Sequence, residues 1–250
     1  MKKIKTSILF IFIFFSAFSQ TKLEIHYNVY FNFGLPIEKL GVLKITENKS
    51  LFEIQTKNAN SSLKLNENGE YTKVVSFTEK GFIDSYFIDF EKQIFVLEEN
   101  ILGETYVVTR GLHNIDWIVM EKTKKIGSFD CQLATGEFRG RIYNVWFTTK
   151  IPIISGPWKL YGLPGLILEA TDSLNQVQFV MESIKTIDDP INFKSLKGSK
   201  EITFEEYVYK KENYKKEFSK KVDSKLPREI RGESVISKSK GLEVFDNTNN

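Results

Sequence analysis

The stretch from Ile151 to Leu168 constrains the fold of this 250-residue chain most. Its glycines and prolines are too dense for a regular helix or strand. Those breakers are Pro152, Gly156, Pro157, Gly162, Pro164 and Gly165. Most of the other residues are large and apolar, so the stretch must either pack inward or expose an apolar patch. We expect a rigid bend that turns Leu163 inward, because Pro164 restricts the backbone and Gly162 and Gly165 free it.

Short runs in which apolar and polar residues alternate surround this stretch. Alternation with a period of two predicts half-buried strands. The predicted strands cover residues 22–33, 40–45, 51–55, 86–90, 94–97, 105–109, 117–122, 126–138, 141–148, 166–171 and 177–187. Thr203 and Glu206 form a capping box that predicts a helix over 203–222. Closely spaced strands without intervening helices favour antiparallel pairing. The predicted fold is mainly β: a curved antiparallel sheet, half-barrel or barrel-like, with one C-terminal helix.

The N-terminus has the pattern of an export signal. Lys2, Lys3 and Lys5 precede an apolar run, and Ala17 and Ser19 fit the small-residue rule for cleavage after Ser19. We therefore predict a signal peptide over 1–19, one β-rich domain over 20–226 and a flexible tail over 227–250. The mature protein is expected in the periplasm or secreted, and not spanning the membrane.

Charge and motifs favour neither a nucleic-acid partner nor a known catalytic centre. Three of the 35 Lys and Arg residues lie in the predicted signal peptide, which leaves 32 basic residues against 32 acidic ones. Two histidines, His26 and His113, and one cysteine, Cys131, offer no recognisable triad or zinc pattern. We predict no catalytic residue, no metal and no cofactor. Cys131 is interpreted as a buried thiol, with a reactive thiol or an intermolecular bridge as the alternatives.

The hexapeptide Gly162-Leu163-Pro164-Gly165-Leu166-Ile167 carries a family resemblance. With its surroundings, it resembles the GLPGLI family of exported proteins from the Bacteroidetes. The surrounding matches are Trp117, 125–127, Cys131, Ala134, 140–141, 145–147, 151–152 and 156–157. The family has no established biochemical function, so the resemblance implies location and fold only. The succession of strands is also similar, as an analogy, to LolA-like half-barrels that carry apolar ligands.

Two interpretations of the loop remain. It could plug one end of the curved sheet, with Trp146 and Trp158 as core aromatics. We instead predict a non-enzymatic binding protein of the cell envelope, which holds an apolar small molecule or a peptide near the loop. Its predicted ligand-binding residues are Trp146, Trp158, Tyr161, Leu163, Pro164 and Leu166, with Arg141 orienting a polar end. Gly156, Pro157, Gly162 and Gly165 form the predicted structural motif.

Two further functions are alternatives. One is an accessory protein that docks to an outer-membrane protein through a sheet edge or the apolar loop. The other is a hydrolase with an unrecognised acidic site, which would require buried carboxylates gathered in one cleft.

Overall fold

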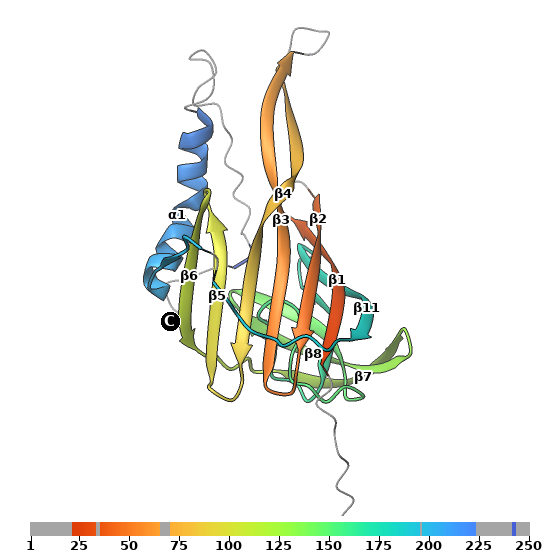
Figure 1. The fold of residues 1–250 in the computed structure, drawn as a ribbon. Helices are drawn as coiled ribbons and strands as arrows, with labels where there is room; N and C mark the ends of the chain where they lie inside the picture. Colours follow the sequence, from red (N-terminus) through yellow and green to blue (C-terminus); the bar gives the residue numbers. More distant parts are fainter. Residues whose placement is uncertain (1–21, 34–35, 66–70, 196, 224–241, 244–250) are drawn as a thin grey trace, which may run out of the picture.

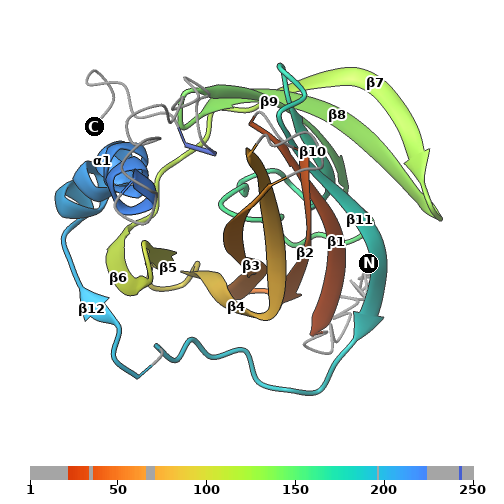
Figure 2. The same ribbon diagram turned by 90° about the horizontal axis from the view of Figure 1, so that it is seen from above.

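One curved sheet forms most of the molecule (Figures 1 and 2). The computed structural model describes residues 22–33, 36–65, 71–195, 197–223 and 242–243. Twelve strands lie in the order β12-β6-β5-β4-β3-β2-β1-β11-β10-β9-β8-β7. The elements are β1 (Leu23–Asn32), β2 (Pro36–Ile45), β3 (Lys49–Leu65), β4 (Tyr71–Asp89), β5 (Ile94–Ile101), β6 (Glu104–Gly111), β7 (Ile118–Ile126), β8 (Phe129–Phe138), β9 (Arg141–Thr148), β10 (Leu166–Asp172), β11 (Val177–Thr186), β12 (Lys200–Glu201) and α1 (Phe204–Asp223). The sheet curls without closing into a barrel.

Antiparallel pairing between chain neighbours builds most of the sheet, which confirms the predicted fold class. The β2–β3, β4–β5 and β8–β9 hairpins form where turn residues separate alternating runs. β1 pairs with β2 on one side and with β11 on the other, so the N-terminal strand joins the two halves of the chain. Only the short β12 pairs in parallel within the described sheet, against β6.

The predicted strand over 126–138 is confirmed from Phe129 onward as β8, but its start is wrong, because a turn separates Ile126 from Phe129. β7 ends at Ile126 and β8 begins at Phe129. Gly127 lies between them with a φ of 57°, a backbone angle that glycine adopts without the strain other residues incur. The sequence therefore contains one more hairpin than predicted, and β7 becomes the last strand of the sheet.

The residues between β9 and β10 lie inside the curve of the sheet, as Figure 2 shows for the green loop. We call residues 149–165 the inner loop. Its side chains join the same core as the inward residues of β1, including Ile25, Tyr27 and Val29. The Tyr27 hydroxyl donates a 2.6 Å hydrogen bond to the carbonyl of Ile167, just beyond the loop. The prediction that this stretch is irregular and turns Leu163 inward is confirmed.

The helix α1 stands beside β5 and β6 (Figure 1). The Thr203 hydroxyl accepts from the amide of Glu206 at 3.1 Å, and the Glu206 carboxylate accepts from the amide of Thr203 at 2.9 Å. This is the reciprocal capping box that the sequence predicted. Tyr207 is fully buried on the inner face of the helix. In the described part of the chain, no helix has the length and apolar character needed to cross a membrane.

Two residues of the predicted tail, Leu242 and Glu243, contact the core. Leu242 packs against the hydrophobic cluster, and the side chain of Glu243 is 2% exposed. At these two positions the structure differs from the predicted flexible tail, because buried partners hold them. The predicted signal peptide and the rest of the predicted tail lie outside the described residues.

Candidate binding site

Backbone contacts fold the inner loop tightly on itself. The amide of Leu166 donates to the carbonyl of Ile151 at 3.0 Å, and that of Ile167 donates to Ser155 at 3.0 Å. Glycine is required at Gly165, because a Cβ there would lie 2.1 Å from the carbonyl oxygen of Thr148. The loop is thus fixed against the end of β9, and its side chains take defined positions within the curve.

The structure brings four of the predicted ligand-binding residues together, but as parts of the core. Trp158, Tyr161, Leu163 and Leu166 are all buried in one hydrophobic cluster. Pro164 is exposed instead. This packing agrees with the loop as a plug for the curved sheet, and the apolar surface predicted for a ligand is covered by the protein itself.

Trp146 is only partly buried and packs at the edge of this cluster. Its neighbours Val145 and Phe147 are buried in the core, so the alternation of β9 turns Trp146 to the opposite face of the sheet. There the ammonium group of Lys124 lies 4.6 Å from the centre of the indole ring. Trp146 is therefore placed with a surface lysine rather than with Trp158.

Arg141 is occupied by a structural ion pair. Its Nη1 lies 2.5 Å from Asp172, and both side chains are at most 2% exposed. Asp172 also accepts hydrogen bonds from the amides of Gln176 and Val177, at 2.7 and 2.8 Å. Arg141 thereby braces the turn between β10 and β11, while its Nε reaches the carbonyl of Leu242 at 3.2 Å.

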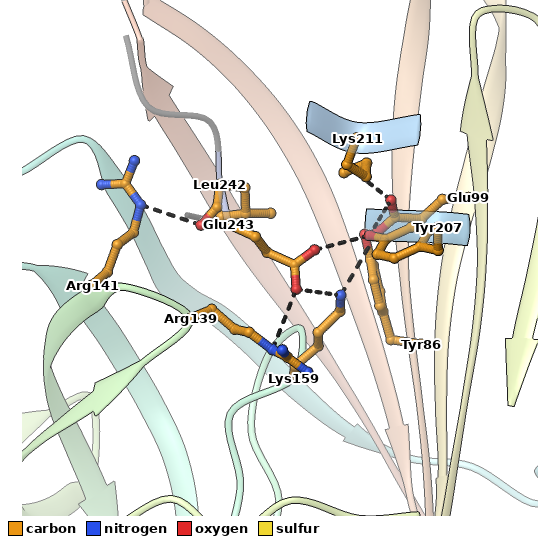
Figure 3. A network of polar contacts seen from close by, with 9 residues as sticks. All are labelled: Tyr86, Glu99, Arg139, Arg141, Lys159, Tyr207, Lys211, Leu242 and Glu243. Carbon is orange, nitrogen blue, oxygen red and sulfur yellow. Dashed lines mark hydrogen bonds and ion pairs between the residues drawn. The ribbon is translucent and has the colours of Figure 1, made fainter. Parts of the chain in front are cut away.

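The only charged residue between positions 151 and 168, Lys159, enters the interior from the inner loop. Its Nζ lies 2.9 Å from Glu243 and 3.9 Å from Glu99, and the residue is 3% exposed (Figure 3). The rings of Tyr86, Trp158, Tyr207 and Phe95 stand 5.2–5.7 Å from the ammonium group. Burial lowers the pKa of Lys159, and Glu243 and Glu99 counteract that effect.

Glu99 of β5 is the second buried charge in the network of polar contacts around Lys159. It accepts hydrogen bonds from the hydroxyl of Tyr86 at 2.6 Å, from Lys211 at 2.8 Å and from Tyr207 at 2.9 Å. Burial alone would raise its pKa, but Lys211 and Lys159 lower it to about 2. Tyr207 also lies 2.9 Å from Glu243 and has one proton to donate. It can therefore serve only one carboxylate at a time, and Lys159 must offset the remaining repulsion.

The ion pairs of Glu99 make the folded state sensitive to acid. Its folded pKa of about 2 lies below the ordinary 4.5, so the stabilisation is full above pH 4.5 and is lost as the pH falls toward 2. The shift corresponds to about 3 kcal/mol. Burial raises the pKa of Asp84 to about 6, which acts in the opposite direction between pH 3.8 and 6.

We therefore expect the free energy of unfolding to decline below pH 3.8, and Glu99→Gln to flatten that decline. Urea unfolding across the acidic range measures both slopes. Glu137→Gln, on the exposed side of β8, is the matched control and should keep the wild-type slope. An unchanged slope in Glu99→Gln would contradict the assignment of the acid sensitivity to this carboxylate.

A small pocket adjoins Lys159, with a volume of about 20 Å³. Its lining residues are Phe95, Arg110, Gly111, His113, Phe138, Arg139, Lys159 and Tyr161. None of these described residues carries a carboxylate, whereas three of them, Arg110, Arg139 and Lys159, are basic. The buried Nη1 of Arg110 has no hydrogen-bond partner among the described residues. Burial and the nearby Arg139 and Arg110 lower the pKa of His113, which favours its neutral form.

Tyr161 connects the inner loop to this pocket. Its hydroxyl donates to the carbonyl of His113 at 2.5 Å and accepts from the amide of His113 at 2.9 Å. Its own carbonyl accepts from the indole of Trp117 at 2.8 Å. The segment after β6 is thus fixed to the loop, and the shape of the pocket depends on the loop conformation.

Sequence reasoning missed the network and the pocket cations. Glu99, Arg110, Arg139 and Tyr207 belong to separate elements, and no local motif joins them. One signal was available, because a lone lysine in an apolar, inward-packing loop needs a buried counter-ion.

Cys131 lies in the core of the sheet. Cys131 is 2% exposed, and burial raises the pKa of its thiol to about 11, which disfavours the reactive thiolate. In the described ranges, no three His, Cys, Asp or Glu residues gather as metal ligands.

Comparisons with known proteins support the fold and a family of unknown function. Residues 139–169 match the family described as "Protein of unknown function (Porph_ging)", a family associated with the Bacteroidetes. No curated protein matches the chain. Two solved structures of PNGF-II, in the C2 and P21 space groups, are similar with TM-scores of 0.51 and 0.53 at 15% identity. Each alignment covers 76% of this chain and about a third of that one, and this likeness shows the fold alone.

Proposed function

We propose that this chain is an exported, non-enzymatic binding protein of the cell envelope and a member of the GLPGLI family. Its ligand carries an anionic group that enters the pocket beside the inner loop. The observation that carries the proposal is the buried Nη1 of Arg110, which has no partner among the described residues of a pocket lined by three cations. A buried donor without an acceptor is costly, and a bound anion would supply that acceptor.

The character of the pocket suggests the chemistry of the ligand. Lys159 and Arg139 also contact Glu243, whereas Arg110 stacks on Phe204 with its guanidinium 4.2 Å from the ring centre. Arg110 is therefore the cation with the most to gain from an added acceptor. Charge-assisted hydrogen bonds to a carboxylate are stronger than neutral ones. The rings of Phe95 and Phe138 in the lining favour a carboxylate attached to an apolar group.

The volume limits what can enter. About 20 Å³ accommodates roughly one water-sized group, so only the head group would be enclosed. This differs from the predicted apolar ligand held by Trp158, Leu163 and Leu166, because those side chains are already buried. The polar end would be oriented by Arg110 rather than by Arg141, which Asp172 occupies.

Sodium octanoate is a suitable probe, with 1-octanol as its uncharged counterpart. Isothermal titration should show octanoate binding to the wild-type chain, weakened at higher salt, and no comparable binding of octanol. Arg110→Gln should weaken octanoate binding about tenfold or more, since it removes a charged hydrogen-bond donor.

Lys150→Gln, an exposed position on the inner loop, is the matched control and should bind as the wild type does. Equal affinity for octanoate and octanol, or an Arg110→Gln chain that binds octanoate unchanged, would refute the proposed anionic site.

A further inference from the structure

Side chains from several parts of the domain contact the segment Leu242–Glu243 (Figure 3). Arg141 Nε donates to the carbonyl of Leu242 at 3.2 Å, which engages the backbone. Lys159 at 2.9 Å and Tyr207 at 2.9 Å engage the carboxylate of Glu243, with Arg139 at 3.7 Å. The side chain of Leu242 packs against the hydrophobic cluster. The domain thus contacts the backbone carbonyl and the apolar side chain of Leu242 and the charged side chain of Glu243.

The residues that hold this segment belong to the folded domain. Arg141 opens β9, Arg139 stands in the turn before it, Lys159 lies in the inner loop and Tyr207 belongs to α1. The sequence separations from the held residues are 101 for Arg141, 84 for Lys159 and 36 for Tyr207. Each of these side chains is also positioned by other contacts: Arg141 by Asp172, Lys159 by Glu99 and surrounding rings, and Tyr207 by the ring of Phe204. The residues that contact Leu242 and Glu243 are therefore held in place by the rest of the domain and not by this segment alone.

We propose that this is a recognition site for a peptide segment with an apolar residue followed by glutamate, and that Leu242–Glu243 is its tethered occupant. A segment of the same kind from another chain competes for the site. The pairing is selective because a glutamate places its carboxylate between Lys159 and Tyr207, while glutamine would bring an uncharged amide to a buried ammonium group. The inference shares Lys159 and Arg139 with the proposed anion pocket but does not depend on an anion binding there.

Because the segment Leu242–Glu243 belongs to the same chain, it has an advantage over any added peptide that competes for the site. A segment attached to the same chain acts at an effective concentration in the millimolar range, so an added peptide at micromolar concentration cannot displace it. Removing the charge of Glu243 weakens the tethered occupant and opens the site to an added peptide. We therefore expect an added peptide that carries the glutamate to bind only when the tethered segment lacks it.

The test uses the full chain and the fluorescein-labelled peptide KGLEVFDN, which corresponds to residues 240–247. By fluorescence polarisation, the Glu243→Gln chain should bind this peptide at least about tenfold more tightly than the wild type. The peptide with glutamine in place of glutamate should bind the same variant about tenfold more weakly. Glu137→Gln, which removes an exposed glutamate of β8, should behave as the wild type.

Either of two results overturns the inference: a folded Glu243→Gln chain that binds the peptide no better than the wild type, or equal binding of the two peptides. Amide NMR spectra establish that the variant is folded. If it does not fold, Leu242→Ala keeps every charge and weakens only the apolar contact, and it should still bind the peptide more tightly than the wild type. If Leu242→Ala and the wild type bind the peptide equally, the inference is also overturned. Failure of the peptide together with successful octanoate binding would reject this inference and leave the anion site standing.

Discussion

Gly165→Ala is expected to destabilise the fold by more than about 3 kcal/mol. The added Cβ would lie 2.1 Å from the carbonyl oxygen of Thr148 and 2.7 Å from its carbonyl carbon. These are backbone atoms at the end of β9, where Thr148 pairs with Leu166, so no side-chain rotation relieves the overlap. Accommodation would require β9 and the start of β10 to separate, and the inner loop between them would lose its anchor.

Urea unfolding followed by tryptophan fluorescence measures this effect as a lower midpoint. Gly111→Ala is the matched control, because a Cβ there meets nothing within 4 Å. It should change the free energy of unfolding by no more than about 0.5 kcal/mol. If the two variants unfold at the same urea concentration, the close approach of Gly165 to Thr148 does not govern the position of the loop.

The strands and the inward packing of the loop could be predicted because their signals are local. Alternation along residues 22–33 marks the face of β1 that carries Ile25 and Tyr27 into the core. In the inner loop, the glycines and prolines exclude regular structure while the apolar residues require burial. Each conclusion needs only neighbouring residues, so the sequence alone was sufficient.

The placement of Trp146 could also have been predicted from the sequence. Val145 and Phe147 flank it in β9, and three successive strand residues cannot all face the core. Grouping Trp146 with Trp158 ignored that period. The turn at Gly127 was missed for a related reason, because the apolar residues on either side continue the strand pattern across it.

The extensions of β3 and β4 were missed because their composition argues against strands. The sequence over 57–62 is rich in Asn and Ser, which are uncommon in strands. Pairing of β3 with β4 holds these residues in register, from Asn58 opposite Thr78 to Leu65 opposite Tyr71. Such pairing is a tertiary effect that overrides weak local preference.

The ionic network could not be assembled from the sequence, because its members meet only after folding. Glu99 and Glu243 are two of 32 acidic residues, and nothing local distinguishes them as the partners of Lys159. The curvature of the sheet brings β5, the inner loop and α1 around one point (Figure 3). A lysine in an apolar loop that packs inward needs a buried counter-ion, but only the fold determines which carboxylates supply it.

Lys159→Met should therefore be among the most destabilising substitutions in the chain, costing about 3–5 kcal/mol. Methionine fills a similar volume but removes the ammonium group 2.9 Å from Glu243, whose carboxylate keeps Tyr207 at 2.9 Å and Arg139 at 3.7 Å. Glu99 retains Lys211, so the uncompensated charge falls mainly on Glu243. Lys150→Met, an exposed lysine of the inner loop, should leave the urea midpoint within about 0.5 kcal/mol of the wild type.

A double-mutant cycle with Glu243→Gln identifies the cause. If the cost of Lys159→Met comes from an unpaired buried carboxylate, neutralising Glu243 in the same chain should recover about 2 kcal/mol of it. The two single substitutions would then be far from additive, because each removes the partner of the other at 2.9 Å. Additive losses would instead mean that Lys159 stabilises the fold through the aromatic rings around its ammonium group, and that the segment at Glu243 is held by Arg141 and Leu242 rather than by charge.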